Sequence, residues 1–315
     1  MVIILSKIAG IFIVMLLGLL INKAKVIPGE ANHYFVTLLL WVTTPCMIYC
    51  SITSREYDPS ILSSTIHMFV IGVAFFLLAV IIGFALAKYV LKVPEKDLGI
   101  YVASFGGINN GFMGFPITLA LFGNNALYYM VIFNIALNIY MYSACPIIMG
   151  IGHDTGKFNV KYIFKTLANP STIICVVSMV MLVKGWNIPD VLFESVEMVG
   201  DITVPLSMLV VGMQLGESNA LKVLKNRKLM LFSVIKMISL PVLVFLLVNW
   251  LPVITAVKIA AVIGATFPCA VVVSAIALME NRNSILASEM VAITTFLSVI
   301  TIPIVSLLLG GYYGV

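Results

Sequence analysis

Apolar residues fill long stretches of this chain, and short polar segments separate them, which is the pattern of repeated membrane crossings. Each stretch is close to the roughly 20 residues that an α-helix needs to cross the hydrocarbon core of a bilayer. We therefore expect an all-α polytopic membrane protein. The pattern predicts ten transmembrane helices, at about residues 2–22, 33–51, 65–87, 98–122, 126–149, 171–186, 190–214, 229–250, 257–279 and 286–310.

The fourth span is interrupted at its centre by residues that disfavour a continuous helix. Residues 106–116 contain four glycines, two asparagines and a proline. Unpaired backbone groups cost several kcal/mol each in lipid, so such a break persists only beside protein or a watery cavity. The ninth span has its own interruption, Gly-Ala-Thr-Phe-Pro-Cys at residues 264–269. Two breaks at corresponding places favour a binding site at the membrane midplane over a simple packing kink.

Several landmarks recur at a nearly constant offset, which indicates an internal repeat. Pro45 and Pro205 are 160 residues apart, and Asn125 and Asn283 are 158 apart. Because each repeat would hold five spans, an odd number, the second must cross the membrane in the opposite direction, as in secondary transporters with inverted repeats. The expected parts are a first repeat at residues 1–152, a cytoplasmic connection at 153–168 and a second repeat at 169–315.

Composition and charge agree with a membrane protein and give it an orientation. The chain is 62% hydrophobic and 10% charged, with a mean hydropathy of +1.14, which leaves too little polar surface for a soluble globule. Ten spans would place thirteen Lys and Arg on one side of the bilayer and four on the other. The positive-inside rule then puts both termini on the extracytoplasmic side of the plasma membrane. Because the five cysteines lie in apolar spans and the three histidines lie apart, we expect no metal site, no cofactor and no nucleic-acid partner.

The chemistry of a broken helix suggests what the site would bind. The upstream half ends in free carbonyl groups, and the downstream half begins with free N–H groups at the positive end of its dipole. Pro116 and Pro268 suit the first turn of the two downstream halves. Asn109, Asn110 and Thr266 are suited to cap these halves or to reach into the cavity. Two opposed positive poles at the membrane centre favour an anion.

The first break also resembles a known motif. Asn109-Asn110-Gly111-Phe112-Met113-Gly114-Phe115-Pro116 resembles the Pro-Asn-Thr-x-x-Met-Gly-x-Pro crossover of the auxin efflux carrier family, which includes plant auxin carriers and bacterial malate or malonate permease-like proteins. Residues 268–303 are similar to the second crossover and last helix of that family. The resemblance implies crossing broken helices 4 and 9 in a fold like that of bile-acid symporters and sodium/proton antiporters. It also implies elevator-type alternating access, an organic anion as substrate and a homodimer.

Two departures from the plant pattern narrow this reading. Ile108 stands where the plant motif has a proline before its asparagine, and the central connection is short. Both features point to a compact microbial type of carrier, and because of Ile108 the resemblance alone does not assign auxin specificity to it.

Other polar residues within the spans have competing interpretations. Asn134, Asn138 and Tyr142 follow four-residue spacing, so they form one stripe that either faces the first break or hydrogen-bonds to a neighbouring helix. Lys236 lies about two turns inside its span, where snorkelling to the cytoplasmic surface is favoured over pairing with substrate charge. Four hydroxyl residues beside two prolines are expected to satisfy the carbonyls that the prolines free, in preference to lining a solvent path. They are Thr43 and Thr44 beside Pro45, and Thr203 and Ser207 beside Pro205.

Intramembrane carboxylates are costly without a role, which makes them candidates for ion coupling. Glu194, Glu197 and Asp201 follow one face of the seventh span, and Asp201 is the deepest of the three. It would line an external vestibule or carry a coupling proton. Glu289 in the tenth span is a similar candidate.

These observations predict a secondary active transporter of a small organic anion, such as malate, another mono- or dicarboxylate, or an auxin-like acid, coupled to H⁺ or Na⁺. The alternatives are a cation/proton antiporter of the same fold and a membrane enzyme or sensor, although the chain has no nucleotide-binding loop, zinc motif or catalytic dyad. The residues assigned to substrate binding are Asn109, Asn110, Gly111, Asn138, Thr266 and Pro268; those assigned to the crossover and its hinges are Gly106, Gly107, Gly114, Pro116, Pro45 and Pro205; those assigned to coupling or a vestibule are Asp201, Glu289 and Lys236.

Overall fold

The computed structural model describes residues 2–55, 58, 60–151, 169–217, 223 and 225–314 of the chain. The expected cytoplasmic connection at 153–168 lies outside the described residues. Within them the protein is helical, as the hydrophobic pattern predicted, and the β pairing among these residues is one isolated bridge. Seven described helical stretches are long and apolar enough to cross a membrane, and two shorter apolar helices accompany them, Pro170–Lys184 and Thr255–Thr266. The division into ten spans therefore stays a prediction.

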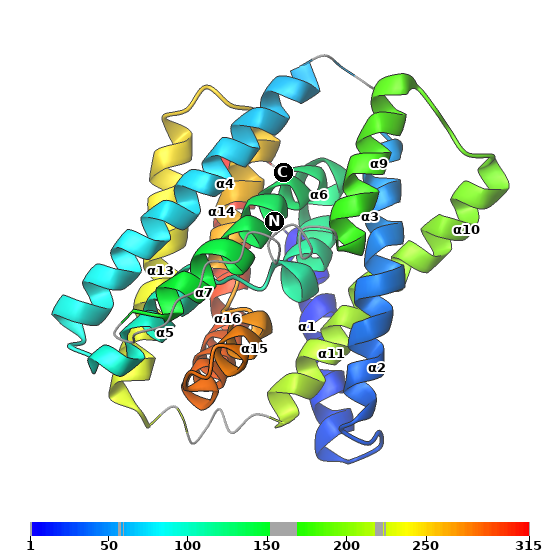
Figure 1. Ribbon diagram of the computed structural model, residues 1–315. Helices are drawn as coiled ribbons and strands as arrows, with labels where there is room; N and C mark the ends of the chain where they lie inside the picture. The colour runs from blue at the N-terminus through cyan, green and yellow to red at the C-terminus, as the bar shows by residue number, and fades with distance from the viewer. Residues whose placement is uncertain are drawn as a thin grey trace.

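Figure 1 shows the order and arrangement of the helices. Several of them contain a short π-helical stretch, denoted η. In chain order the elements are α1 (Val2–Lys23), α2 (Ala31–Leu38), η1 (Leu39–Thr43), α3 (Thr44–Thr53), α4 (Ser60–Ala85), η2 (Leu86–Val90), α5 (Glu95–Gly106), η3 (Asn110–Gly114), α6 (Phe115–Ile139), η4 (Tyr140–Ala144), α7 (Cys145–Met149), α9 (Pro170–Lys184), α10 (Asp190–Asp201), α11 (Thr203–Glu217), α13 (Arg227–Asn249), α14 (Thr255–Thr266), α15 (Val271–Met279) and α16 (Ser284–Tyr313).

The helices form two groups that pack mainly within themselves (Figure 1). The first group, which we call the frame, contains α1, α2, α3, α9, α10 and α11; α1 lies along α11, and α3 lies against α9 and α10. The second group, which we call the core group, contains α4 to α7 and α13 to α16. A Cβ at Gly18 or Gly212 would overlap backbone of the facing helix, so these glycines allow α1 and α11 to pack closely.

Both interruptions predicted from the sequence are present in the core group. After α5 the chain is non-helical through residues 107–109, with Gly107 extended, before η3 begins at Asn110. After α14 it is extended through residues 267–270 before α15 begins at Val271. We call these two segments the paired breaks, because an antiparallel bridge joins Ile108 to Cys269. In that bridge the Asn109 N–H donates to the Pro268 carbonyl at 2.8 Å, and the Ala270 N–H donates to the Gly107 carbonyl at 3.2 Å.

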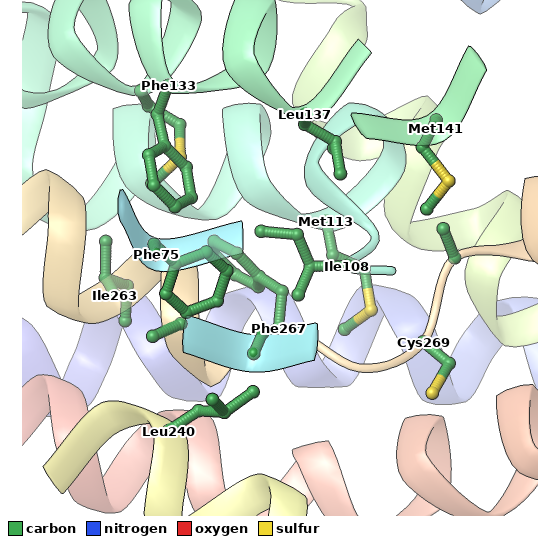
Figure 2. Packing of buried hydrophobic residues seen from close by; sticks show 14 of the residues in the cluster. Phe75, Ile108, Met113, Phe133, Leu137, Met141, Leu240, Ile263, Phe267 and Cys269 are labelled. Atoms are coloured by element: carbon green, nitrogen blue, oxygen red, sulfur yellow. The ribbon is translucent and has the colours of Figure 1, made fainter. Parts of the chain in front are cut away.

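The paired breaks satisfy much of each other's backbone, which explains how extended chain persists at this depth. Figure 2 shows Ile108, Phe267 and Cys269 within one buried apolar cluster that also contains Met113 and Phe133. All five side chains are almost completely buried. The bridge and this cluster together fix the two breaks side by side.

The two prolines that were expected to begin the downstream halves behave differently. Pro116 lies in the first turn of α6, as predicted. The prediction for Pro268 is wrong, since α15 begins three residues later and Pro268 belongs to the extended segment. The non-helical segment continues past Pro268 to Ala270, because residues 267–270 stay extended where they pair with the first break. A separate kink in α6 at Gly123, with φ of 76°, lies where the fourth and fifth predicted spans meet.

Candidate functional site

A cavity of about 260 Å³ lies beside the paired breaks, at the boundary between the frame and the core group. The first turns of three helical segments line it, at residues 109–111 for η3, 169–171 for α9 and 270–272 for α15. Its other lining residues are Leu40, Trp41, Thr44, Ile108, Phe112, Phe115, Asn134, Leu137, Asn138, Met141 and Tyr142.

The two adjacent asparagines of the first break have different environments. The Asn109 side-chain oxygen accepts a hydrogen bond from the Phe112 N–H at 3.3 Å, so Asn109 caps the downstream segment as predicted. Asn110 is only 1% exposed, and neither its amide nitrogen nor its amide oxygen has a hydrogen-bond partner. A Cβ at Gly114 would overlap the Asn110 side-chain oxygen, so glycine leaves room for this amide. Asn110 therefore keeps an unused donor and an unused acceptor in the wall of the cavity.

The other two helix starts bring the N–H groups of their first turns to the cavity wall. The first N–H groups of an α-helix have no intrahelical partner, and α15 has no side-chain cap. At the start of α9 the Asn169 side-chain oxygen accepts from the Thr172 N–H at 3.0 Å. The sequence reasoning missed α9 as part of this site. The dipeptide Asn169-Pro170, a cap followed by proline at the first helical position, was the available signal for a helix start there.

The electrostatics of the cavity are set by helix ends. None of the described lining residues is Asp, Glu, Lys, Arg or His. Each helix start carries a partial positive charge of roughly half a unit, and these partial charges act strongly where water is scarce. The arrangement is suited to an anion held by backbone N–H groups and the neutral Asn110 amide.

The polar stripe on α6 and η4 faces the same cavity. Asn134, Asn138 and Tyr142 all line it, which agrees with the first of the two interpretations. The Asn138 amide nitrogen also lies 3.5 Å from the Thr172 hydroxyl of α9, so the stripe contacts the frame as well. Asn109, Asn110, Gly111 and Asn138 are thus brought together, as expected of a common site.

Two residues assigned to substrate binding lie elsewhere. The Thr266 hydroxyl donates to the Val262 carbonyl of its own helix at 3.0 Å, and Thr266 is fully buried. Pro268 takes part in the bridge through its carbonyl. Neither residue lines the cavity; the second break contributes residues 270–272 in their place. The difference arises because α14 continues to Thr266 and the extended segment follows it.

The residues assigned as hinges occupy close contacts. A Cβ on Gly106 would lie 2.9 Å from the Tyr140 ring, and one on Gly107 would overlap the Val273 side chain. Pro45 lies in the first turn of α3, directly after η1, and Pro205 lies near the start of α11. Whether these positions act as hinges stays a prediction.

Lys236 of α13 lies in the protein interior and not at the membrane surface. Its side chain is 0% exposed, and its ammonium donates to the carbonyls of Ser104 at 3.0 Å, Phe105 at 2.8 Å and Gly107 at 3.3 Å. The expected snorkelling is therefore wrong. The last carbonyls of α5 have no helical partner, and they lie within reach of the ammonium. They accept the hydrogen bonds that water at the cytoplasmic surface would otherwise accept from Lys236.

The candidate coupling carboxylates lie away from the cavity. Asp201 is exposed at the end of α10, and Glu289 is half-buried on α16. Their roles stay predictions. Among the residues that the structure describes, no group of three His, Cys, Asp or Glu side chains could hold a metal ion, and the five cysteines are unpaired.

Comparisons with known proteins identify the family. The family model described as "Membrane transport protein" matches residues 3–155 and 154–306, nearly the whole chain. An uncharacterized transporter from Methanocaldococcus jannaschii is 24% identical over 214 residues, which cover 65% of this chain and 67% of that protein. The match confirms the family to which the motif around Asn109 and Asn110 pointed: this chain belongs to the membrane transport protein family, the family of the auxin efflux carriers.

Proposed function

We propose that this protein is a secondary carrier of a small organic anion, which it holds at the paired breaks. One observation carries the proposal: three helix starts converge on a cavity whose described lining has no charged side chain. Partial positive charges that are fixed in place, with no carboxylate to oppose them, favour a bound anion. The unpaired Asn110 amide supports this reading, since a ligand would satisfy it.

The size of the cavity favours a small solute. Pockets for drug-sized ligands are about 300–1,000 Å³, and this cavity is about 260 Å³. A mono- or dicarboxylate such as malate suits that volume. The apolar neighbours Trp41, Phe112 and Met141 would contact the carbon skeleton while the helix starts bind the carboxylates.

The division into two groups supports elevator-type alternating access. The cavity lies at their boundary, where Leu40, Trp41 and Thr44 of the frame face residues 108–115 of the core group. Movement of the core group along the frame would expose the cavity to one side of the membrane and then to the other. The proposal includes ten spans in two inverted repeats, extracytoplasmic termini in the plasma membrane, H⁺ or Na⁺ coupling and a homodimer.

A cation/proton antiporter would need a carboxylate at the site to bind its cation. The described lining offers amides and helix starts and no acidic side chain. We therefore place the anion carrier ahead of the antiporter.

Exchange in liposomes tests the proposal. Purified protein should exchange internal malate, or a related carboxylate, for labelled external anion, and Asn110→Ala should abolish this exchange. Ser195→Ala on the exposed side of α10 is the matched control and should keep wild-type exchange. Wild-type exchange by Asn110→Ala would contradict the site. Sodium-driven proton movement without exchange of any carboxylate in a panel would favour the antiporter.

A further inference from the structure

The ammonium of Lys236 is an uncompensated charge at the centre of the core group. It is completely buried, and its three N–H donors match three carbonyl acceptors, on Ser104, Phe105 and Gly107. The Cys269 side chain is a further hydrogen-bond partner of Lys236, and among the described residues no carboxylate is one. The side chain therefore brings a whole positive charge to the negative end of the α5 dipole.

Other groups complete the carbonyl end of α5. The Ala103 carbonyl accepts from the Gly107 N–H at 2.9 Å and from the Tyr140 hydroxyl at 3.0 Å. The Ser104 carbonyl also accepts from the Cys269 thiol at 3.1 Å. Lys236 thus fills a position that is surrounded by backbone oxygens, which is the environment that broken transporter helices offer to Na⁺.

The position of Lys236 is also linked to the cavity through the bridge. The Gly107 carbonyl accepts from Lys236 on one side and from the Ala270 N–H on the other. Ala270 lies directly before α15 and lines the cavity, whereas Lys236 does not. Lys236 therefore acts on the site by fixing the paired breaks and by neutralising the end of α5, one of the two negative helix ends beside them; the other is the end of α14 at Thr266.

The first repeat shows no counterpart of this cation on the matching helix. At the offset of 157–160 residues found for the landmarks, Lys236 corresponds to residues 76–79 of α4, which are Phe-Leu-Leu-Ala. The two repeats therefore differ at this position: one has a lysine, Lys236, and the other has the apolar residues 76–79.

We propose that Lys236 is a built-in cation of the paired breaks, which takes the place at the end of α5 that a bound monovalent cation would otherwise fill. The fold then needs no Na⁺ at this position. A variant that lacks the ammonium but leaves its space open should acquire a Na⁺ site. The consequence for transport rests on the proposed function, but the Na⁺ site itself does not.

Thermal unfolding without substrate tests this inference. Melting temperatures would be measured in detergent in NaCl, KCl and N-methyl-D-glucamine chloride at equal ionic strength, for the wild type, Lys236→Ala and Lys236→Met. The wild type should melt at the same temperature in all three salts. Lys236→Ala should melt lower in N-methyl-D-glucamine chloride and regain on the order of 5 °C in saturating NaCl.

The remaining variants separate ion binding from general salt effects. Lys236→Met fills the space without a charge, so it should be destabilised and show no Na⁺ response. Ser233→Ala, at another buried polar position one turn away on α13, should respond to salt as the wild type does. Because no substrate is present, these results are independent of whether the carried solute is an anion.

Three outcomes would overturn the inference. They are a Na⁺-dependent rise in the melting temperature of the wild type, a folded Lys236→Ala protein that is indifferent to Na⁺ and K⁺, and a Lys236→Ala protein that does not fold in NaCl although Lys236→Met folds. If neither variant folds, the inference is decided by the melting temperatures of the wild type in the three salts. A wild type that is indifferent to Na⁺ supports the built-in cation.

Discussion

Asn109 and Asn110 are neighbours of the same residue type, yet the structure predicts opposite effects on stability when each is replaced by alanine. The Asn109 oxygen caps η3 through the Phe112 N–H. Loss of a helix cap of this kind costs about 0.5–2 kcal/mol. Asn110 holds a buried amide whose two polar atoms have no partner. Each unsatisfied buried group costs about 1–3 kcal/mol, so its removal should stabilise the fold.

We therefore expect Asn109→Ala to lower the free energy of unfolding by about 1 kcal/mol and Asn110→Ala to raise it by about 1–3 kcal/mol. The assay is thermal unfolding of detergent-purified protein, where 1 kcal/mol corresponds to a shift of about 2–4 °C for domains of 150–250 residues. A carboxylate that stabilises the wild type should have a much smaller effect on Asn110→Ala, because the ligand-binding amide is gone.

The contrast between the two variants contains its own control. Both substitutions remove the same amide from adjacent positions, so a general effect of the change would move both melting temperatures together. If Asn110→Ala lowers the melting temperature as much as Asn109→Ala does, the Asn110 amide supports the fold and the reasoning that assigns it to a ligand is refuted.

Three further predictions concern two closely packed glycines and one buried hydrogen bond. Gly107→Ala would overlap a side chain of α15, so it should cost about 1–3 kcal/mol and stop transport, whereas Gly111→Ala meets nothing within 4 Å and should leave the melting temperature unchanged. Gly212→Ala would overlap a backbone carbonyl of α1 and should prevent recovery of monodisperse protein, while Gly10→Ala in the open part of α1 should stabilise by about 0.5–1 kcal/mol. Tyr140→Phe removes a hydrogen bond to a carbonyl of α5 and should cost about 0.5–1.5 kcal/mol in thermal unfolding. An unchanged melting temperature for Gly107→Ala, normal yields of Gly212→Ala, or wild-type stability of Tyr140→Phe would contradict the respective packing argument.

The sequence predicted the helical class and the breaks in two helices, and four of the six residues that it assigned to substrate binding line the cavity. Helix-breaking residues such as Gly106, Gly107 and Gly114 can only be kept in an apolar span where the freed backbone groups find partners. That requirement is local, so it can be read from the order of residues. The stripe at Asn134 and Asn138 is also local, because four-residue spacing places side chains on one face of a helix.

The sequence did not predict which distant groups would hydrogen-bond to the freed backbone groups. Pro268 was expected in the first turn of α15, but its carbonyl pairs with the Asn109 N–H from another part of the chain. Lys236 was expected at the membrane surface, but it reaches carbonyls more than 125 residues away in sequence. Asn169 and Pro170 showed a helix start but not which cavity that start would face.

The sequence by itself determined that the chain forms long apolar helices and where two of them break, because both follow from the hydrophobicity and backbone preferences of neighbouring residues. Only the tertiary structure decided that the breaks pair through Ile108 and Cys269, that three helix starts share one cavity and that Lys236 donates hydrogen bonds to carbonyls at the end of α5. The physical reason is that hydrogen bonds and charges in a dry interior depend on which distant groups packing brings within about 3 Å.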